Sequence, residues 1–94
     1  LGWLRKNKVS YILDEVVNEP SYLSALGTEE IWTKLTSAVE LLPAKQKRVF
    51  EMKYFMDKTY DEISQELNLT TGGLKANYHH AVQKIRKELQ KNMI

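Results

Sequence analysis

Residues 59–89 read TYDEISQELNLTTGGLKANYHHAVQKIRKEL, and this stretch decides the fold. Thr59 is followed three residues later by Glu62, which is the capping-box pattern that begins a helix. Asn68 is expected to end that helix, because asparagine tolerates the left-handed backbone of a tight turn. The pattern predicts a short helix over 60–67 followed by a turn.

A longer helix is expected after this turn, from Thr70 or Thr71 to about Gln90. Its apolar residues recur with the period of one helix face over about four turns. The positions expected to face inward are Ile63 and Leu67 on the short helix, Leu69 in the turn, and Leu74, Tyr78, Ala81, Val82, Ile85 and Leu89 on the long helix. A short capped helix, a tight turn and a longer basic helix together predict a helix-turn-helix unit.

Two further helices are predicted upstream. The first begins after Thr28, taken as its cap, and the second runs from Pro43, taken as its first residue, to about Met56. One face of the first carries Ile31, Trp32, Leu35, Ala38, Val39 and Leu42. With no alternating strand pattern in the chain, the fold expected is all-α: a small winged-helix-like bundle of four to five helices that ends in a helix-turn-helix.

The chain divides near residue 27. Residues 1–27 contain loop-like stretches around Pro20 and Gly27, and they are interpreted as an inter-domain linker with one helix through Val9–Val17. Residues 28–94 are interpreted as the helix-turn-helix domain.

Charge is distributed unevenly over the 94 residues. Residues 1–42 have a net charge of −2 and residues 43–94 a net charge of +4, which adds to the +2 of the whole chain. This asymmetry favours a polyanion as the partner of the C-terminal part, although a solvated helix face would have the same composition. The absence of cysteine suits a cytoplasmic protein, and no apolar run is long enough to span a membrane.

The outer face of the long helix follows from about 100° of rotation per residue. The residues expected to point away from the core are Gly72, Gly73, Ala76, His79, His80, Gln83, Lys84 and Lys87, with Lys75 and Asn77 on the flanks. Small residues at the start of the helix let it enter a major groove, where Lys75 and Asn77 reach base edges and Lys84 reaches phosphates. The two glycines suit close approach of backbone amides to a phosphate, and the alternative is that they only fray the helix start.

No catalytic or metal site is predicted. His79 and His80 are adjacent and point about 100° apart on a helix, and neither has a histidine or carboxylate four residues away. The acidic residues Asp61 and Glu62 are explained by the helix dipole and by capping. We therefore expect no enzymatic activity, no cofactor and no small-molecule substrate.

Three segments carry a resemblance to a known family. They are LLPAKQKRVF at 41–50, YDEISQEL at 60–67 and LKANYHHA at 74–81. In this order and spacing they closely resemble region four of extracytoplasmic-function (ECF) RNA polymerase sigma factors, over about half of the chain.

The resemblance implies a set of DNA-contacting residues. Those facing the minus-thirty-five promoter element would be Thr71, Gly72, Lys75, Ala76, Asn77 and His80, and those touching phosphates would be Arg48 and Thr59. Four residues depart from the family pattern: Ser64 replaces alanine, Asn68 replaces glycine, and Asn77 and His80 stand where arginine is frequent. Asparagine favours adenine where arginine favours guanine, so the base preference would differ.

The resemblance also implies partners, namely promoter DNA, the RNA polymerase core through its β flap, and an anti-sigma factor. The chain would be the C-terminal piece of a longer protein, with Trp3-Leu4-Arg5 as the remnant of the preceding sigma domain. Two alternatives stay open at this point. One is the helix-turn-helix output domain of a response regulator or quorum sensor, and the other is a helical interaction module that does not bind DNA.

Overall fold

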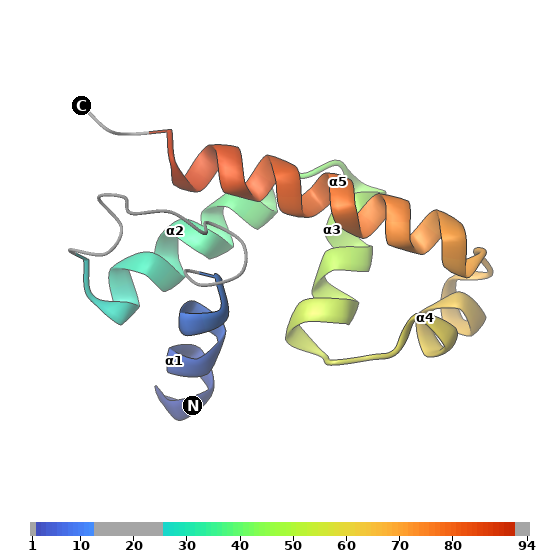
Figure 1. The fold of residues 1–94 in the computed structure, drawn as a ribbon, viewed down its shortest axis with the longest axis horizontal. Coiled ribbons are helices and arrows are strands. Elements are labelled where there is room, and N and C mark those ends of the chain that lie inside the picture. The colour runs from blue at the N-terminus through green and yellow to red at the C-terminus, as the bar shows by residue number, and fades with distance from the viewer. Residues whose placement is uncertain (1, 13–25, 92–94) are drawn as a thin grey trace.

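The computed structural model describes residues 2–12 and 26–91, which form an arrangement of helices (Figure 1). The α-helices are α1 (Gly2–Tyr11), α2 (Thr28–Glu40), α3 (Ala44–Phe50), α4 (Tyr60–Leu67) and α5 (Thr71–Leu89), and α3 continues into the π-helical segment η3 (Glu51–Phe55). Within the described ranges there is no strand, so the predicted all-α class is confirmed.

The long helix α5 is the element on which α2, α3 and α4 pack. Its C-terminal half crosses α2, its middle crosses α3, and its N-terminal end contacts α4 (Figure 1). This arrangement divides the interior into two clusters. The main cluster comprises the buried residues Ile12, Leu35, Ala38, Val39, Leu42, Phe50, Tyr54, Ala81, Ile85 and Leu89. The smaller helix-turn-helix cluster comprises Val49, Met52, Ile63 and Leu74.

The two upstream helices begin one residue away from their predicted starts. Gly27, and not Thr28, is the N-cap of α2, and the Glu30 carboxylate accepts a hydrogen bond of 3.2 Å from the Gly27 amide. Pro43 is the N-cap of α3 and not its first residue, because its backbone is extended while its carbonyl accepts from the Lys47 amide at 2.8 Å. The inward face predicted for α2 is confirmed, with Trp32 half-buried.

The helix predicted from Pro43 to Met56 is not an α-helix throughout. From Glu51 to Phe55 the turn widens to a π-helix, and the Met56 amide donates to the Glu51 carbonyl at 3.1 Å. The residue types of this segment suit both helix types, so the widening has no local signal. It accompanies the tertiary contacts of Tyr54, whose hydroxyl donates to the Lys8 carbonyl.

The first helix lies earlier than predicted. We expected it over Val9–Val17, whereas α1 spans Gly2–Tyr11, and residues 13–17 lie outside the described part of the chain, as does the loop around Pro20. Val9 and Ile12 are buried, and α1 packs against α2. The described contacts that hold α1 come from residues 8–12, and those of Lys8 reach a residue 46 positions away, which no local pattern reveals.

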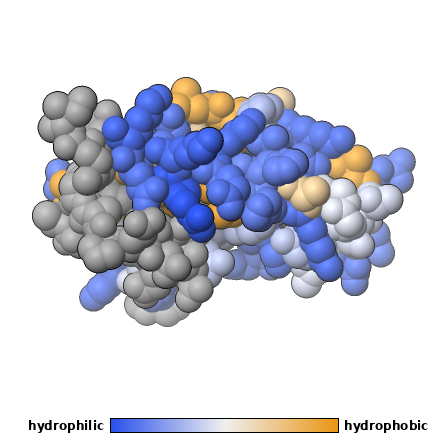
Figure 2. All heavy atoms as spheres, turned by 45° about the horizontal axis from the view of Figure 1, so that its top comes forward, coloured by the Kyte–Doolittle hydropathy of each residue, from blue (hydrophilic) through white to orange (hydrophobic). Residues whose placement is uncertain are grey.

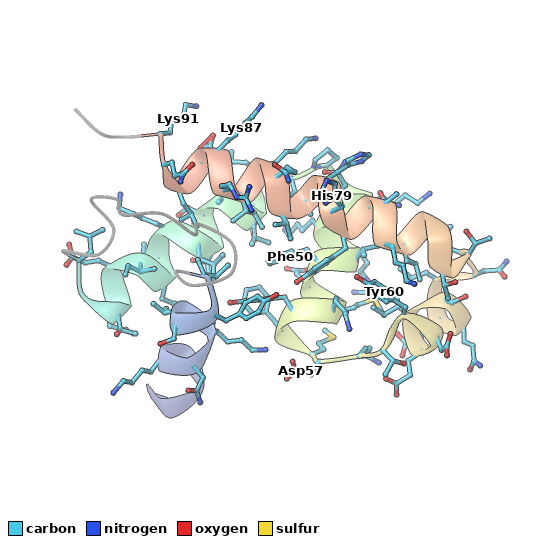
Figure 3. The ribbon with its side chains drawn as sticks, in the orientation of Figure 1. Phe50, Asp57, Tyr60, His79, Lys87 and Lys91 are labelled. Atoms are coloured by element: carbon cyan, nitrogen blue, oxygen red, sulfur yellow. The ribbon has the colours of Figure 1, made fainter. Side chains whose placement is uncertain are left out.

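A chain of aromatic rings crosses the molecule from α1 to α4. Ring centroids are 5.7 Å apart for Tyr11 and Tyr54, 5.0 Å for Tyr54 and Phe50, and 5.5 Å for Phe50 and Tyr78. Tyr60 follows at 6.4 Å from Tyr78. Phe50 lies where this chain passes beneath α5, and Tyr60 is the first residue of α4 (Figure 3).

Candidate nucleic-acid interface

The short helix α4 begins with the predicted capping box. The Thr59 hydroxyl accepts a hydrogen bond of 3.1 Å from the Glu62 amide, and the Glu62 carboxylate accepts one of 2.8 Å from the Thr59 amide. These hydrogen bonds stabilise the charged carboxylate and hold the pKa of Glu62 below its ordinary value of 4.5. The predicted helix over 60–67 is confirmed.

The turn between α4 and α5 is held by Asn68 and Ser64. Asn68 adopts the left-handed conformation expected of it, with φ of 56°. The Ser64 hydroxyl donates to the Leu69 carbonyl at 2.5 Å, and the Leu69 amide donates to the Ser64 carbonyl at 3.3 Å. The serine that departs from the family pattern therefore forms a hydrogen bond that an alanine could not form.

The two helices of the unit are fixed together by the helix-turn-helix cluster. Ile63 of α4 and Leu74 of α5 have no exposed surface, and Leu67, Leu69 and Tyr78 pack against them while partly exposed. This packing fixes the rotation of α5, and with it the set of residues that α5 presents outward.

The N-terminus of α5 is capped and sterically open. The Thr70 hydroxyl accepts a hydrogen bond from the Gly73 amide at 3.0 Å. The amides of Thr71 and Gly72 come before Gly73, among the first amides of a helix, which have no carbonyl acceptor within it. A Cβ atom on Gly72 would meet nothing within 4 Å, whereas one on Gly73 would lie 3.1 Å from the Thr70 hydroxyl oxygen. The fold itself therefore does not require glycine at position 72.

The predicted outer face of α5 points to solvent for most of its residues. The exposed ones are Gly72, Gly73, Lys75, Ala76, His79, His80, Lys84 and Lys87, and the half-buried ones are Thr71, Asn77 and Gln83. His79 and Lys87 project from the edge of α5 opposite Phe50 and Tyr60 (Figure 3). The surface seen from this side is largely hydrophilic (Figure 2).

Asn77 is held within the helix in this structure. Its side-chain amide donates to the Gly73 carbonyl at 3.0 Å, one helical turn earlier. A rotation of the side chain is needed before both its donor and its acceptor can reach the edge of a base.

A shallow hollow lies between the N-termini of α4 and α5. Its lining residues are Lys53, Thr59, Tyr60, Asp61, Thr71 and Lys75. The Lys53 and Lys75 ammonium nitrogens lie 4.6 and 5.8 Å from the centroid of the Tyr60 ring, so two cations contact one aromatic ring. Partial burial raises the pKa of the Tyr60 hydroxyl, which remains a neutral donor.

The hollow brings together three of the residues predicted to contact DNA and adds two that were missed. Thr59, Thr71 and Lys75 were expected at the interface, while Arg48 is exposed on α3 and Lys84 lies farther along α5. The missed pair is Lys53 and Tyr60. The position of Lys53 depends on how η3 meets α4, which no local pattern in the sequence reveals.

The described ranges contain neither a cluster of metal ligands nor a membrane-spanning helix. No group of three or more histidine, cysteine or acidic side chains could hold a metal ion in the part of the chain that the structure describes. The His79 and His80 ring centroids are 6.2 Å apart on adjacent helical positions. None of the helices described is both long and apolar enough to cross a bilayer.

Comparison with known proteins gives a consistent result. The family described as sigma-70, region 4, matches residues 32–85. A Haemophilus influenzae protein named "Probable RNA polymerase sigma factor" is 30% identical over 66 residues, which cover 70% of this chain and 34% of that protein. The ECF RNA polymerase sigma factor SigD of Mycobacterium bovis is 26% identical over 57 residues, which cover 61% of this chain and 27% of the relative.

The chain thus spans about a third of the length of these relatives. No solved structure matches it. The matched segment begins within α2 and ends within α5, so it contains the complete helix-turn-helix. The chain therefore belongs to the sigma-70 region 4 family, as the order and spacing of its three motifs predict.

Proposed function

We propose that this domain reads the minus-thirty-five promoter element for a sigma factor during transcription initiation, with the start of α5 in the major groove. The observation that carries the proposal is the outward face of α5. It begins with a capped, sterically open turn at Gly72 and continues through the exposed Lys75, Ala76 and His80. A base-reading helix needs this combination of fixed rotation, small residues at its start and polar side chains one turn later.

Phosphates flanking the element would be bound by the hollow between α4 and α5. Lys53 and Lys75 supply two positive charges, and the hydroxyl groups of Thr59 and Tyr60 supply neutral donors. Arg48, exposed on α3, and Lys84, farther along α5, would add phosphate contacts outside this hollow. Contacts of this kind position the helix without reading the sequence, and they make affinity fall steeply with salt.

A second part of the proposal concerns protein partners. The named relatives are RNA polymerase sigma factors, so the protein that contains this chain is proposed to bind the polymerase core, with the β flap as the contact of this domain. The match to sigma-70 region 4 favours this function over the output domain of a response regulator. An anti-sigma factor as regulator stays a prediction from the resemblance.

The DNA-binding part is tested by selecting duplexes that bind the chain from a random-sequence pool and measuring affinity by fluorescence anisotropy. Lys75→Ala is expected to lower affinity for the selected duplex and, because one positive charge is lost, to reduce the slope of log K against log salt by about one. Lys91→Ala removes the same charge near the C-terminus of α5, where Lys91 pairs with Glu88 at 3.3 Å, and serves as the matched control.

Asn77→Ala tests the reading of bases. Loss of a base contact costs about 1–3 kcal/mol and relaxes the preference at one position of the selected sequence. If Lys75→Ala and Asn77→Ala both bind like the parent, the recognition helix has been assigned wrongly. Polymerase binding is tested separately, by co-purification of the core enzyme with the whole protein. DNA binding without polymerase binding would contradict a sigma factor.

A further inference from the structure

Both histidines of the chain lie on the outer face of α5. The sequence contains two, His79 and His80, and both side chains are exposed. Their ring centroids are 6.2 Å apart, and His79 projects from the edge of α5 opposite Phe50 and Tyr60 (Figure 3). Imidazole is the side chain that gains or loses its charge between about pH 5 and 8. On this face, pH can therefore alter the charge that α5 presents outward.

The two rings stand in a basic part of α5. Residues 71–87 include no aspartate or glutamate. Each histidine has a lysine four residues away, Lys75 before His79 and Lys84 after His80, and residues four apart are neighbours on a helix surface. No carboxylate of α5 lies within one turn of either ring.

The helices beside α5 bring few acids that are not already engaged. The middle of α5 crosses α3, whose charged side chains are Lys45, Lys47 and Arg48 (Figure 1). The acids on either side of α3 are Glu40, which ends α2, and Glu51, which begins η3. A hydrogen bond of 2.8 Å to Glu40 and the charge of Glu51 raise the pKa of Lys47, so both carboxylates act on this lysine. The other charged residues of α2, Glu29, Glu30 and Lys34, lie in its first two turns.

The acids of α4 and the end of α5 are engaged as well. Glu62 accepts the hydrogen bond of its own capping box, Glu66 pairs with Lys58, and Asp61 lines the hollow that contains two lysines. Glu88 pairs at 3.3 Å with the lysine three residues on. Within residues 2–12 and 26–91 no ion pair joins a carboxylate to either histidine. The described part of the domain thus supplies no ion-pair partner for a charged imidazole.

DNA would supply this partner. His79 and His80 lie one helical turn beyond Lys75 and Ala76, which is about 6 Å farther along the axis of α5. With the start of α5 in a major groove about 12 Å wide, this turn lies between the two phosphate backbones. An opposite charge nearby favours the charged form of an imidazole. The complex should therefore hold protons on these rings more tightly than the free domain does.

We propose that promoter binding by this domain takes up protons on His79 and His80, so that its affinity for DNA rises as pH falls. The inference rests on the proposed promoter recognition and adds a form of regulation to it. The gain in affinity is complete below the pH at which the rings titrate in the free domain, and it is lost as pH rises through the titration of the complex. A lysine or arginine at either position would stay charged over this range.

The first test measures affinity for the selected duplex at constant ionic strength from pH 5.5 to 8.5. For the parent, affinity should rise by about threefold to tenfold per histidine as pH falls, because a titration shifted by 0.5–1 pH unit corresponds to these factors. His79→Gln and His80→Gln should each remove one share, and the double variant should bind equally at every pH. His80→Arg should keep the share of that position up to pH 8.5.

Lys91→Ala is the matched control for the loss of charge. It removes a cation near the end of α5 but no imidazole, so the full pH dependence should remain. The variants of His79 and His80 replace exposed side chains and leave the core untouched.

The second test observes the protons directly by nuclear magnetic resonance. Because the chain has two histidines, it gives two imidazole Cε1–H signals, which the single glutamine variants assign. Each signal should titrate at a pH about 0.5–1 unit higher with the duplex bound than in the free chain.

The results that would overturn the inference are distinct from those that would overturn promoter recognition. Equal titration of both signals with and without DNA would exclude proton uptake by the histidines. Equal pH dependence of the parent and the double glutamine variant would place the effect on other groups. Tight binding that does not change with pH would overturn proton uptake and leave promoter recognition intact. Failure to bind any duplex at any pH would overturn both.

Discussion

Replacing Gly72 with alanine should stabilise the fold and weaken DNA binding at the same time. Position 72 is helical with no positive φ, and a Cβ atom there meets nothing within 4 Å. Alanine is favoured over glycine in a helix by up to about 1 kcal/mol, with a smaller gain expected in the first turn. A gain of about 0.5–1 kcal/mol raises the melting temperature of a domain of this size by roughly 2–8 °C.

The effect on DNA binding has the opposite sign. If the amides of Thr71 and Gly72 donate to a phosphate, an added methyl group holds the backbone away from it. Loss of one hydrogen bond to a charged group costs about 1.5–3 kcal/mol. Affinity for the selected duplex should therefore fall by about tenfold or more.

Gly73 provides the matched control. A Cβ atom there would lie 3.1 Å from the Thr70 hydroxyl oxygen, which caps α5 through the Gly73 amide. Disturbing this cap costs up to about 1 kcal/mol and offsets the gain in helix propensity. Gly73→Ala should therefore leave stability nearly unchanged.

The assay combines thermal unfolding by circular dichroism with anisotropy titration against the selected duplex. A Gly72→Ala chain that is stabilised and binds DNA like the parent would refute the close approach of the α5 terminus to a phosphate. A destabilised Gly72→Ala chain would refute the open space at position 72 itself.

Three further predictions concern the helix-turn-helix unit. Ile63→Ala should lower the free energy of unfolding by about 2–5 kcal/mol, because the side chain is fully buried in a small cluster and leaves a cavity. Ser64→Ala should cost about 0.5–1.5 kcal/mol in urea unfolding, since the hydrogen bond to the Leu69 carbonyl is lost. Glu62→Gln should lower the free energy of unfolding at neutral pH, because the charged carboxylate is lost. It should also remove the part of the pH dependence of stability that comes from the titration of Glu62. The folded pKa of Glu62 is lowered, so that contribution is present above about pH 4.5 and is lost as pH falls through the folded pKa.

Each of these predictions has a result that would contradict it. Leu41 is 68% exposed, so Leu41→Ala is the control for Ile63→Ala and should cost less than about 0.5 kcal/mol; equal losses would place Ile63 outside the core. Unchanged stability of Ser64→Ala would mean that water replaces the hydroxyl. If the free energies of unfolding of the parent and of Glu62→Gln differ by the same amount at every pH down to 2, the charge of Glu62 is not the source of that difference.

The helix-turn-helix could be predicted from sequence because its signals are local. Thr59, Glu62 and Asn68 specify the ends of α4 within a few residues, and the structure places each in the conformation expected. The outward direction of Lys75 and His80 then follows from the helical period once Leu74 is buried.

What the sequence did not reveal depends on contacts between distant segments. The position of α1 is determined by Lys8 and Tyr54, which are 46 residues apart. The π-helical turn of η3 uses residues that an α-helix accepts equally well. The hollow at Tyr60 needs Lys53 and Lys75 from different helices on one ring, and the inward hydrogen bond of Asn77 competes with the base contact expected of it.

The aromatic chain from Tyr11 to Tyr60 has a consequence for spectroscopy. Neighbouring rings at 5.0–6.4 Å are close enough for their electronic transitions to couple. The near-ultraviolet circular dichroism of these tyrosines therefore arises from the coupled rings together and not from single residues. Tyr11 is the terminal ring on α1, and Tyr60 is the terminal ring beside the hollow. One optical band, recorded without any attached label, should thus report both a change in the packing of Tyr11 on Tyr54 and the arrival of a phosphate beside Tyr60.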